Sequence, residues 1–149
     1  MNIADYLIAQ AGKDWARLLG DWAPPLPARF SVWLVNRLGD AFVVDENGTI
    51  LRLDVGTGTC VAVAASREQF AQQLDTGDNA EQWLKVRLVD ACRGAGMHLG
   101  PFQCYGFRIP PTLGGEYKVP NLLPTNLAVH YSYQAYICKQ ADIYWIPPE

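Results

Sequence analysis

The feature that most constrains this chain is the dipeptide Asn47-Gly48, which stands between two apolar runs. Asn and Gly tolerate the positive φ angles of a two-residue type I′ turn, so the pair predicts a β-hairpin in which Glu46 faces Thr49. A second turn at residues 56–59 returns the chain along residues 60–65. The stretch 34–65 is therefore expected to form a β-meander.

This register also predicts which side chains of the hairpin face the core. Successive residues of a strand point to opposite sides of the sheet, so apolar and polar positions separate by face. The core face would hold Phe42, Val44, Leu51 and Leu53, and the outer face would hold Val43, Asp45, Ile50, Arg52 and Asp54. The carboxylates of Asp45 and Asp54 are therefore expected to point into solvent.

The remaining patterns predict an α+β fold. Apolar residues spaced three and four apart predict an amphipathic helix over residues 3–20, and similar spacing predicts helices over 67–75 and 79–95. Apolar runs between turn residues predict strands over 29–36, 41–46, 49–55 and 60–64. We expect a single domain over 1–149, with a mixed, mainly antiparallel sheet and helices packed on one face.

The last third of the chain changes character. Residues 96–126 are rich in Gly and Pro and are expected to form a loop region, interrupted by a short strand over 103–109. Residues 128–140 fit a helix or a strand, with the helix favoured, and residues 142–149 are expected to form an extended tail. The loop region presents polar candidates for binding, which are Tyr105, Arg108, Glu116 and Tyr117.

Composition limits the class of protein. Half of the 149 residues are apolar and 18% are charged, which indicates a folded domain. No apolar run is long enough for a membrane span, and the N-terminus lacks the basic segment of a secretory signal. The four cysteines form no C-x-x-C pair, so they are expected to be reduced and buried in a cytoplasmic protein.

Acidic side chains concentrate in residues 40–81, which hold eight acids and two bases. A nucleic-acid-binding surface would show the opposite bias. One interpretation is a solvated face; the other is a docking surface for a basic partner, because complementary charge speeds association. The acids on or beside the hairpin are the first candidates: Asp40, Asp45, Glu46 and Asp54.

Catalytic chemistry finds little support in the sequence. The two histidines, His98 and His130, lack the spacing of a zinc site, and the segment GTGTC lacks the lysine of a phosphate-binding loop. Cys104 with His130 could form a nucleophile and base, so a Cys/His hydrolase is a less favoured hypothesis. No catalytic residue, metal or cofactor is predicted.

Four stretches together resemble one known family: LVNRLGDAFVVDENGTILRLDVGTG, VAVAASREQFAQQL, QCYGFRIPPTLGGEY and PTNLAVHYSYQAYICKQ. They are similar to the C-terminal domain of type VI secretion DNase-immunity proteins, a former domain of unknown function that often follows a GAD-like domain. A more distant resemblance is to the SUKH superfamily of immunity proteins. The most specific parts are Gly39-Asp40, Leu53-Asp54 and the loop from Pro110 to Tyr117. Because only a short helix precedes the match, no GAD-like domain is expected before it.

The resemblance implies a non-enzymatic immunity protein that neutralises a cognate bacterial toxin, with a secreted nuclease as the candidate toxin. The partner would be a toxin with a basic surface, and neither nucleic acid nor membrane is an expected partner. The acidic hairpin is the first candidate contact and the Gly/Pro-rich loop is the second. The alternative function is an adaptor module in a larger assembly, for which exposed Trp33, Tyr105 and Tyr117 would form an apolar patch.

Overall fold

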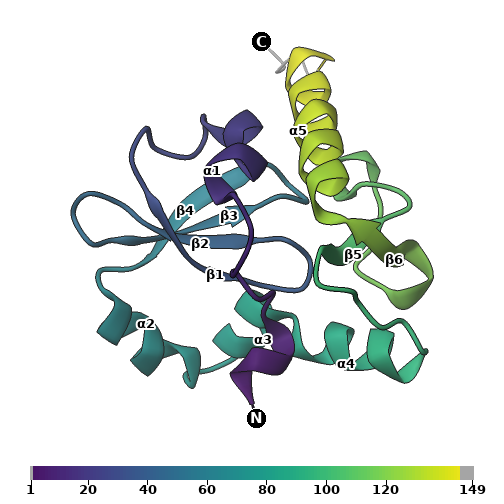
Figure 1. The fold of residues 1–149 in the computed structure, drawn as a ribbon, viewed down its shortest axis with the longest axis horizontal. Helices are drawn as coiled ribbons and strands as arrows, with labels where there is room; N and C mark the ends of the chain where they lie inside the picture. Colours follow the sequence, from purple (N-terminus) through teal and green to yellow (C-terminus); the bar gives the residue numbers. More distant parts are fainter. Residues whose placement is uncertain (1, 145–149) are drawn as a thin grey trace.

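A four-stranded antiparallel meander in the order β1-β2-β3-β4 is the centre of the fold (Figure 1). The computed structural model describes residues 2–144, and side-chain burial is described for residues 2–141. The strands of the meander are β1 (Ser31–Val35), β2 (Ala41–Val44), β3 (Ile50–Asp54) and β4 (Thr59–Ala64). They occupy the four predicted strand positions, so the predicted meander is confirmed.

A smaller sheet pairs β5 (Gln103–Phe107) with β6 (Leu122–Asn126), and the long helix α5 (Leu127–Tyr144) follows β6 directly. Three shorter helices lie between the sheets in the sequence, namely α2 (Arg67–Leu74), α3 (Asn79–Leu84) and α4 (Val86–Gly94). The α+β class and the antiparallel pairing are confirmed. Within the described part of the chain, no helix is long and apolar enough to cross a lipid bilayer.

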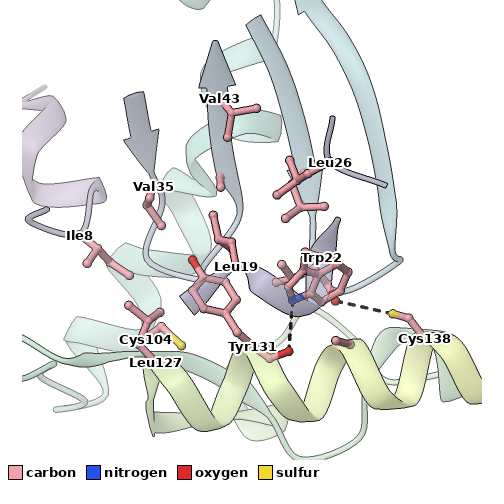
Figure 2. Close-up of a cluster of buried hydrophobic side chains, with 14 residues drawn as sticks. Ile8, Leu19, Trp22, Leu26, Val35, Val43, Cys104, Leu127, Tyr131 and Cys138 are labelled. Atoms are coloured by element: carbon pink, nitrogen blue, oxygen red, sulfur yellow. Dashed lines mark hydrogen bonds between the residues drawn. The ribbon is translucent and has the colours of Figure 1, made fainter. Parts of the chain in front are cut away.

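Helices cover both faces of the meander rather than one. Phe70 of α2 and Trp83 of α3 stack with ring centroids 4.6 Å apart and pack under Phe42. On the opposite face, α5 packs against β2 and β3 (Figure 2). There the indole N–H of Trp22 donates to the backbone oxygen of Tyr131 at 3.1 Å. The sequence therefore predicted correctly that α2 and α3 pack on one face of the sheet. It did not predict that α5 packs on the other face.

The register predicted for the hairpin is wrong by one residue. The turn has three central residues, because Val44 pairs with Ile50 and the N–H of Asp45 donates to Thr49 O at 3.0 Å. Gly48 alone takes a positive φ, +81°, as in a type I turn followed by a bulged glycine. The shift turns Leu51 and Leu53 to the face of Ala41 and Val43, and puts Arg52 opposite Phe42. Since both faces of the hairpin are covered, the apolar pattern accommodates either register.

The predicted N-terminal helix over residues 3–20 is also wrong. The segment contains η1 (Ile3–Tyr6), α1 (Trp15–Leu18) and η2 (Gly20–Trp22), separated by extended chain and a turn. Leu7 bridges to Asn36, and the N–H of Ile8 donates to the backbone oxygen of Val35 at 2.8 Å. The edge of β1 thus binds this backbone, and Gly12, with φ +74°, turns the chain.

Three further boundaries differ from the predictions. The helix predicted over 79–95 is divided into α3 and α4 by Lys85, whose φ is +54°. Strand β6 was missed inside the Gly/Pro-rich region, whereas the favoured helix over 128–140 is confirmed by α5. Residues 142–144 of the expected extended tail continue α5, and residues 145–149 lie outside the described part of the chain.

Candidate functional site

The loop Asn36–Asp40, between β1 and β2, connects the meander to α5. The amide oxygen of Asn36 accepts hydrogen bonds from the N–H groups of Leu38 and Asp40, both at 3.0 Å. From α5, His130 Nε2 lies 3.0 Å from Leu38 O, and the Tyr131 hydroxyl donates to Gly39 O at 2.7 Å. A side chain on Gly39 would lie 3.2 Å from the His130 ring, so α5 sits directly on this loop.

Asp40, the first residue of the predicted acidic contact, is buried with 2% of its surface exposed. Its carboxylate accepts from the N–H of Val55 at 3.0 Å and from the Asn36 side-chain amide at 3.1 Å. Burial raises the pKa of Asp40 to about 6, the Asp54 carboxylate adds to the rise, and Arg52 opposes it. Asp40 therefore holds the fold together and is not part of the surface, so its assignment to a partner contact is corrected.

Arg52 lies between the two carboxylates at this end of the sheet, 4.0 Å from Asp40 and 3.6 Å from Asp54. Asp54 also accepts from the N–H groups of Gly56 and Thr57, at 3.0 and 3.2 Å. These bonds hold the turn between β3 and β4 in the manner of an Asx turn. Asp54 was predicted to point its carboxylate into solvent, but this carboxylate pairs with Arg52 and accepts hydrogen bonds from the N–H groups of its own turn.

Tyr117, from the Gly/Pro-rich loop, packs onto the same end of the sheet. A Cβ on Gly56 would collide with the Tyr117 hydroxyl, so these two residues are in direct contact. The Phe107 ring packs edge-on at 5.3 Å, and the Lys85 ammonium lies 4.8 Å from the centre of the Tyr117 ring. Burial raises the pKa of Tyr117, and the Asp54 and Asp40 carboxylates add to it. The structure thus brings parts of the two predicted contacts together.

The other residues of the loop separate into buried and accessible ones. Tyr105 is buried, and its hydroxyl donates to Met97 O at 2.6 Å, so it is corrected as a contact residue. Arg108 and Glu116 are exposed, and Glu116 lies 3.3 Å from the Lys118 ammonium. Trp33 is half-buried and packs edge-on against Phe70. Trp33, Tyr105 and Tyr117 therefore do not form the exposed aromatic patch that the adaptor hypothesis predicted.

The tip of the hairpin carries the accessible part of the predicted acidic contact. Asp45 and Asp40 flank the extended strand β2, which separates their Cα atoms by about 17 Å, so the four acids do not form one patch. Asp45 accepts from the N–H groups of Asn47 and Thr49 at 2.8 and 3.0 Å and so supports the turn. Glu46 is exposed and lies 3.6 Å from the guanidinium of Arg29, whose side chain is exposed as well.

The Cys104 and His130 side chains do not form a nucleophile and base. Cys104 is fully buried and makes no hydrogen bond to a histidine, and burial raises its pKa. Burial lowers the pKa of His130 to about 4, and its Nε2 bonds to Leu38 O. A catalytic thiol needs a depressed pKa and a paired base. Cys104 and His130 therefore do not support the Cys/His hydrolase hypothesis. Cys60, Cys92 and Cys104 are free thiols.

Sequence reasoning missed the outer face of α5, defined here by Val129, Tyr133 and Tyr136. These residues are 59%, 47% and 59% exposed and follow the i, i+4, i+7 spacing of one side of a helix. Leu113, 59% exposed, lies on η3 (Pro111–Leu113), which contacts α5. The signal was present as apolar spacing in residues 128–140, but a core stripe and an exposed stripe look alike in a sequence.

Comparison with known proteins gives one family. Residues 64–136 match the sequence profile of the family described as T6SS immunity protein Tdi1, C-terminal, where T6SS is the type VI secretion system. The match covers just under half of the chain, from the end of β4 to Tyr136 in α5. It confirms the resemblance to type VI secretion immunity proteins over these residues. No curated protein matches the chain.

A similar solved structure is the crystal structure of Atu4351 from Agrobacterium tumefaciens. It is 20% identical, with a TM-score of 0.52 over 80% of this chain. At that identity the likeness supports the fold and nothing more. The chain spans 60% of the length of that structure.

Proposed function

We propose that this chain, whose residues 64–136 resemble type VI secretion immunity proteins, is a non-enzymatic immunity protein that binds and neutralises a cognate toxin in the cytoplasm. The family match is the observation that carries the proposal. A secreted nuclease is the toxin class that the resemblance implies. Nuclease clefts are basic, and an acidic surface on an immunity protein complements them.

The first candidate contact is the tip of the hairpin, where Glu46 is the accessible carboxylate. Its partner Arg29 is also exposed, and exposed ion pairs of this kind contribute little to stability, about 0–1 kcal/mol. Glu46 is therefore free to exchange Arg29 for a cation of the toxin. Asp45 contributes charge at the same tip while its oxygen holds the turn.

The second candidate contact is the outer face of α5. It lies inside the matched residues 64–136, whereas Glu46 and the whole hairpin lie outside them. Tyrosines in exposed apolar stripes are common anchors of protein interfaces, because they bury a large rigid ring and still offer a hydroxyl. Leu113 on η3 would extend this surface toward the Gly/Pro-rich loop.

Co-expression with the product of the neighbouring gene tests the proposal. If the chain is an immunity protein, that product is toxic alone, is tolerated with this chain, and is recovered with it in a pull-down. A control chain with Val61→Ser, a change at an exposed apolar residue of β4, should protect equally well. A stable complex with a non-toxic partner would favour an adaptor, and the absence of both complex and protection would contradict both functions.

A further inference from the structure

A small polar cavity lies where the N-terminal segment meets α4 and the smaller sheet. Its volume is about 150 Å³, and its lining consists of Arg37, Arg93, His98, Leu99 and Tyr105. The lining contains two guanidinium groups and an imidazole but no carboxylate. This cavity is separate from the hairpin tip and from the outer face of α5.

Each arginine is held in place by backbone oxygens rather than by an acid. Arg37 donates to the backbone oxygens of Ala4 and Asp5, both at 3.3 Å, and Arg93 also donates to Asp5 O. The Arg93 guanidinium lies 5.6 Å from the centre of the Tyr6 ring. These contacts fix the direction of both side chains and use only part of the five N–H donors of each guanidinium.

The positive charges of Arg37 and Arg93 have no neighbouring carboxylate among the described residues. No carboxylate of the described residues lies within 4.0 Å of either guanidinium, and the Asp90 carboxylate accepts from the Tyr6 hydroxyl at 2.8 Å. Burial and then the neighbouring Arg93 lower the pKa of Arg37, while Tyr105 and the Asp5 carboxylate partly offset this lowering. Two like charges in a half-buried place cost free energy that a bound anion would offset.

We propose that the cavity formed by Arg37, Arg93, His98 and Tyr105 binds a phosphate group. Guanidinium forks match the oxygens of phosphate, and the adjacent His98 imidazole suits a remaining oxygen, whereas the Tyr105 hydroxyl already donates to Met97 O and only lines the cavity. The volume of about 150 Å³ accommodates one phosphate group. A neighbouring cavity of about 220 Å³ shares Arg37 and Leu99 and reaches Gln103, so the rest of a phosphorylated small molecule has a place to lie. This site does not depend on the proposed immunity function.

Calorimetric titration of the full chain with sodium phosphate, against sodium chloride of matched ionic strength, tests the site. We expect saturable binding that Arg37→Gln and Arg93→Gln each weaken about tenfold, since each removes charge-assisted hydrogen bonds. Arg87→Gln is the matched control, because Arg87 is an exposed arginine on the same helix, α4, and lies outside the lining. It should bind phosphate as the unchanged chain does.

A second variant separates binding from folding. His98 is exposed and makes no hydrogen bond within the described structure, so His98→Ala should leave the unfolding transition unchanged and still weaken phosphate binding. Adenosine 5′-monophosphate is the second probe: tighter binding than phosphate assigns the site to a phosphorylated small molecule, and equal binding assigns it to free phosphate. Absence of saturable binding by both probes would overturn the proposal, as would equal weakening by Arg87→Gln.

Discussion

The Asp40 carboxylate accepts a hydrogen bond from the N–H of Val55 at 3.0 Å, so the residue before β2 holds the residue after β3. The same carboxylate accepts from Asn36, whose side chain also donates to Trp83 O at 3.0 Å. One acidic side chain thus joins the meander, the loop Asn36–Asp40 and, through that loop, α3. Removing it should loosen several elements together.

We expect Asp40→Ala to lower the free energy of unfolding by about 3 kcal/mol, because the Val55 N–H loses its buried acceptor and the Asn36 amide and Arg52 each lose one of their two partners. Glu46→Ala, at an exposed acid, should change it by less than about 0.5 kcal/mol. Urea unfolding of both variants measures the difference. Equal effects of the two substitutions would show that Asp40 is not structural.

Asp40 and His130 should give opposite pH dependences of stability. Burial raises the pKa of Asp40 from 3.8 to about 6, so stability falls as pH rises through that range, where the folded state binds the extra proton. Burial lowers the pKa of His130 from 6.5 to about 4, so stability rises with pH between about 4 and 6.5, where the unfolded state binds the extra proton. The two contributions therefore oppose each other across this pH range.

The two opposing contributions are measurable separately with single variants. Asp40→Asn removes the falling contribution, and its stability should rise from pH 4 to pH 6.5 more steeply than that of the unchanged chain. His130→Gln keeps a donor for Leu38 O and should show the opposite trend below about pH 6. Urea midpoints at several pH values within this range measure both slopes. Parallel curves for all three proteins would contradict the assigned titrations.

We expect Gly56→Ala to destabilise the protein by about 1–3 kcal/mol, because the added methyl group meets the Tyr117 hydroxyl and lies 3.0 Å from the Pro111 ring. Tyr117→Phe in the same chain should restore part of the loss, since it removes the closest atom. The control is Gly94→Ala, which meets no atom within 4 Å and should be neutral or stabilising in α4. A double-mutant cycle with no coupling between Gly56 and Tyr117 would place the loop elsewhere.

The hairpin contact predicts a charge effect confined to binding. Glu46→Lys should slow association with a basic toxin and reduce the salt dependence of binding, with little change in stability. Asp45→Lys should instead destabilise the turn, because it removes the acceptor for Asn47 and Thr49. Stopped-flow association at two salt concentrations measures the effect. Unchanged rates for Glu46→Lys would move the contact to α5.

The contact through α5 predicts a loss of affinity that salt does not alter. Tyr133→Ser combined with Tyr136→Ser should raise the dissociation rate of the toxin complex at least about tenfold, because interface tyrosines often contribute more than 1 kcal/mol each. Both side chains are exposed, so the unfolding transition should remain within about 0.5 kcal/mol. Val61→Ser is the control on a different exposed apolar residue. Equal dissociation rates would exclude the outer face of α5.

Local chemistry in the sequence was enough to locate most elements. The turn residues around Asn47-Gly48 and residues 56–59 placed β2, β3 and β4, and an apolar run placed β1. Apolar spacing placed α2 and favoured α5. Two helix predictions failed. Residues 3–20 have helical spacing, yet the edge of β1 offers a backbone partner that binds Ile8. Residues 79–95 have the apolar spacing of one helix, yet the left-handed backbone of Lys85 divides them into two.

What the sequence by itself determined is the α+β class, the antiparallel meander and the resemblance that residues 64–136 confirm. What only the tertiary structure decided is the role of each polar residue. Asp40 and Glu46 are both acids near one hairpin, but packing buries one among backbone donors and leaves the other in solvent. The physical reason is that burial and hydrogen bonding depend on segments far apart in the chain, here α5 and the loop Asn36–Asp40.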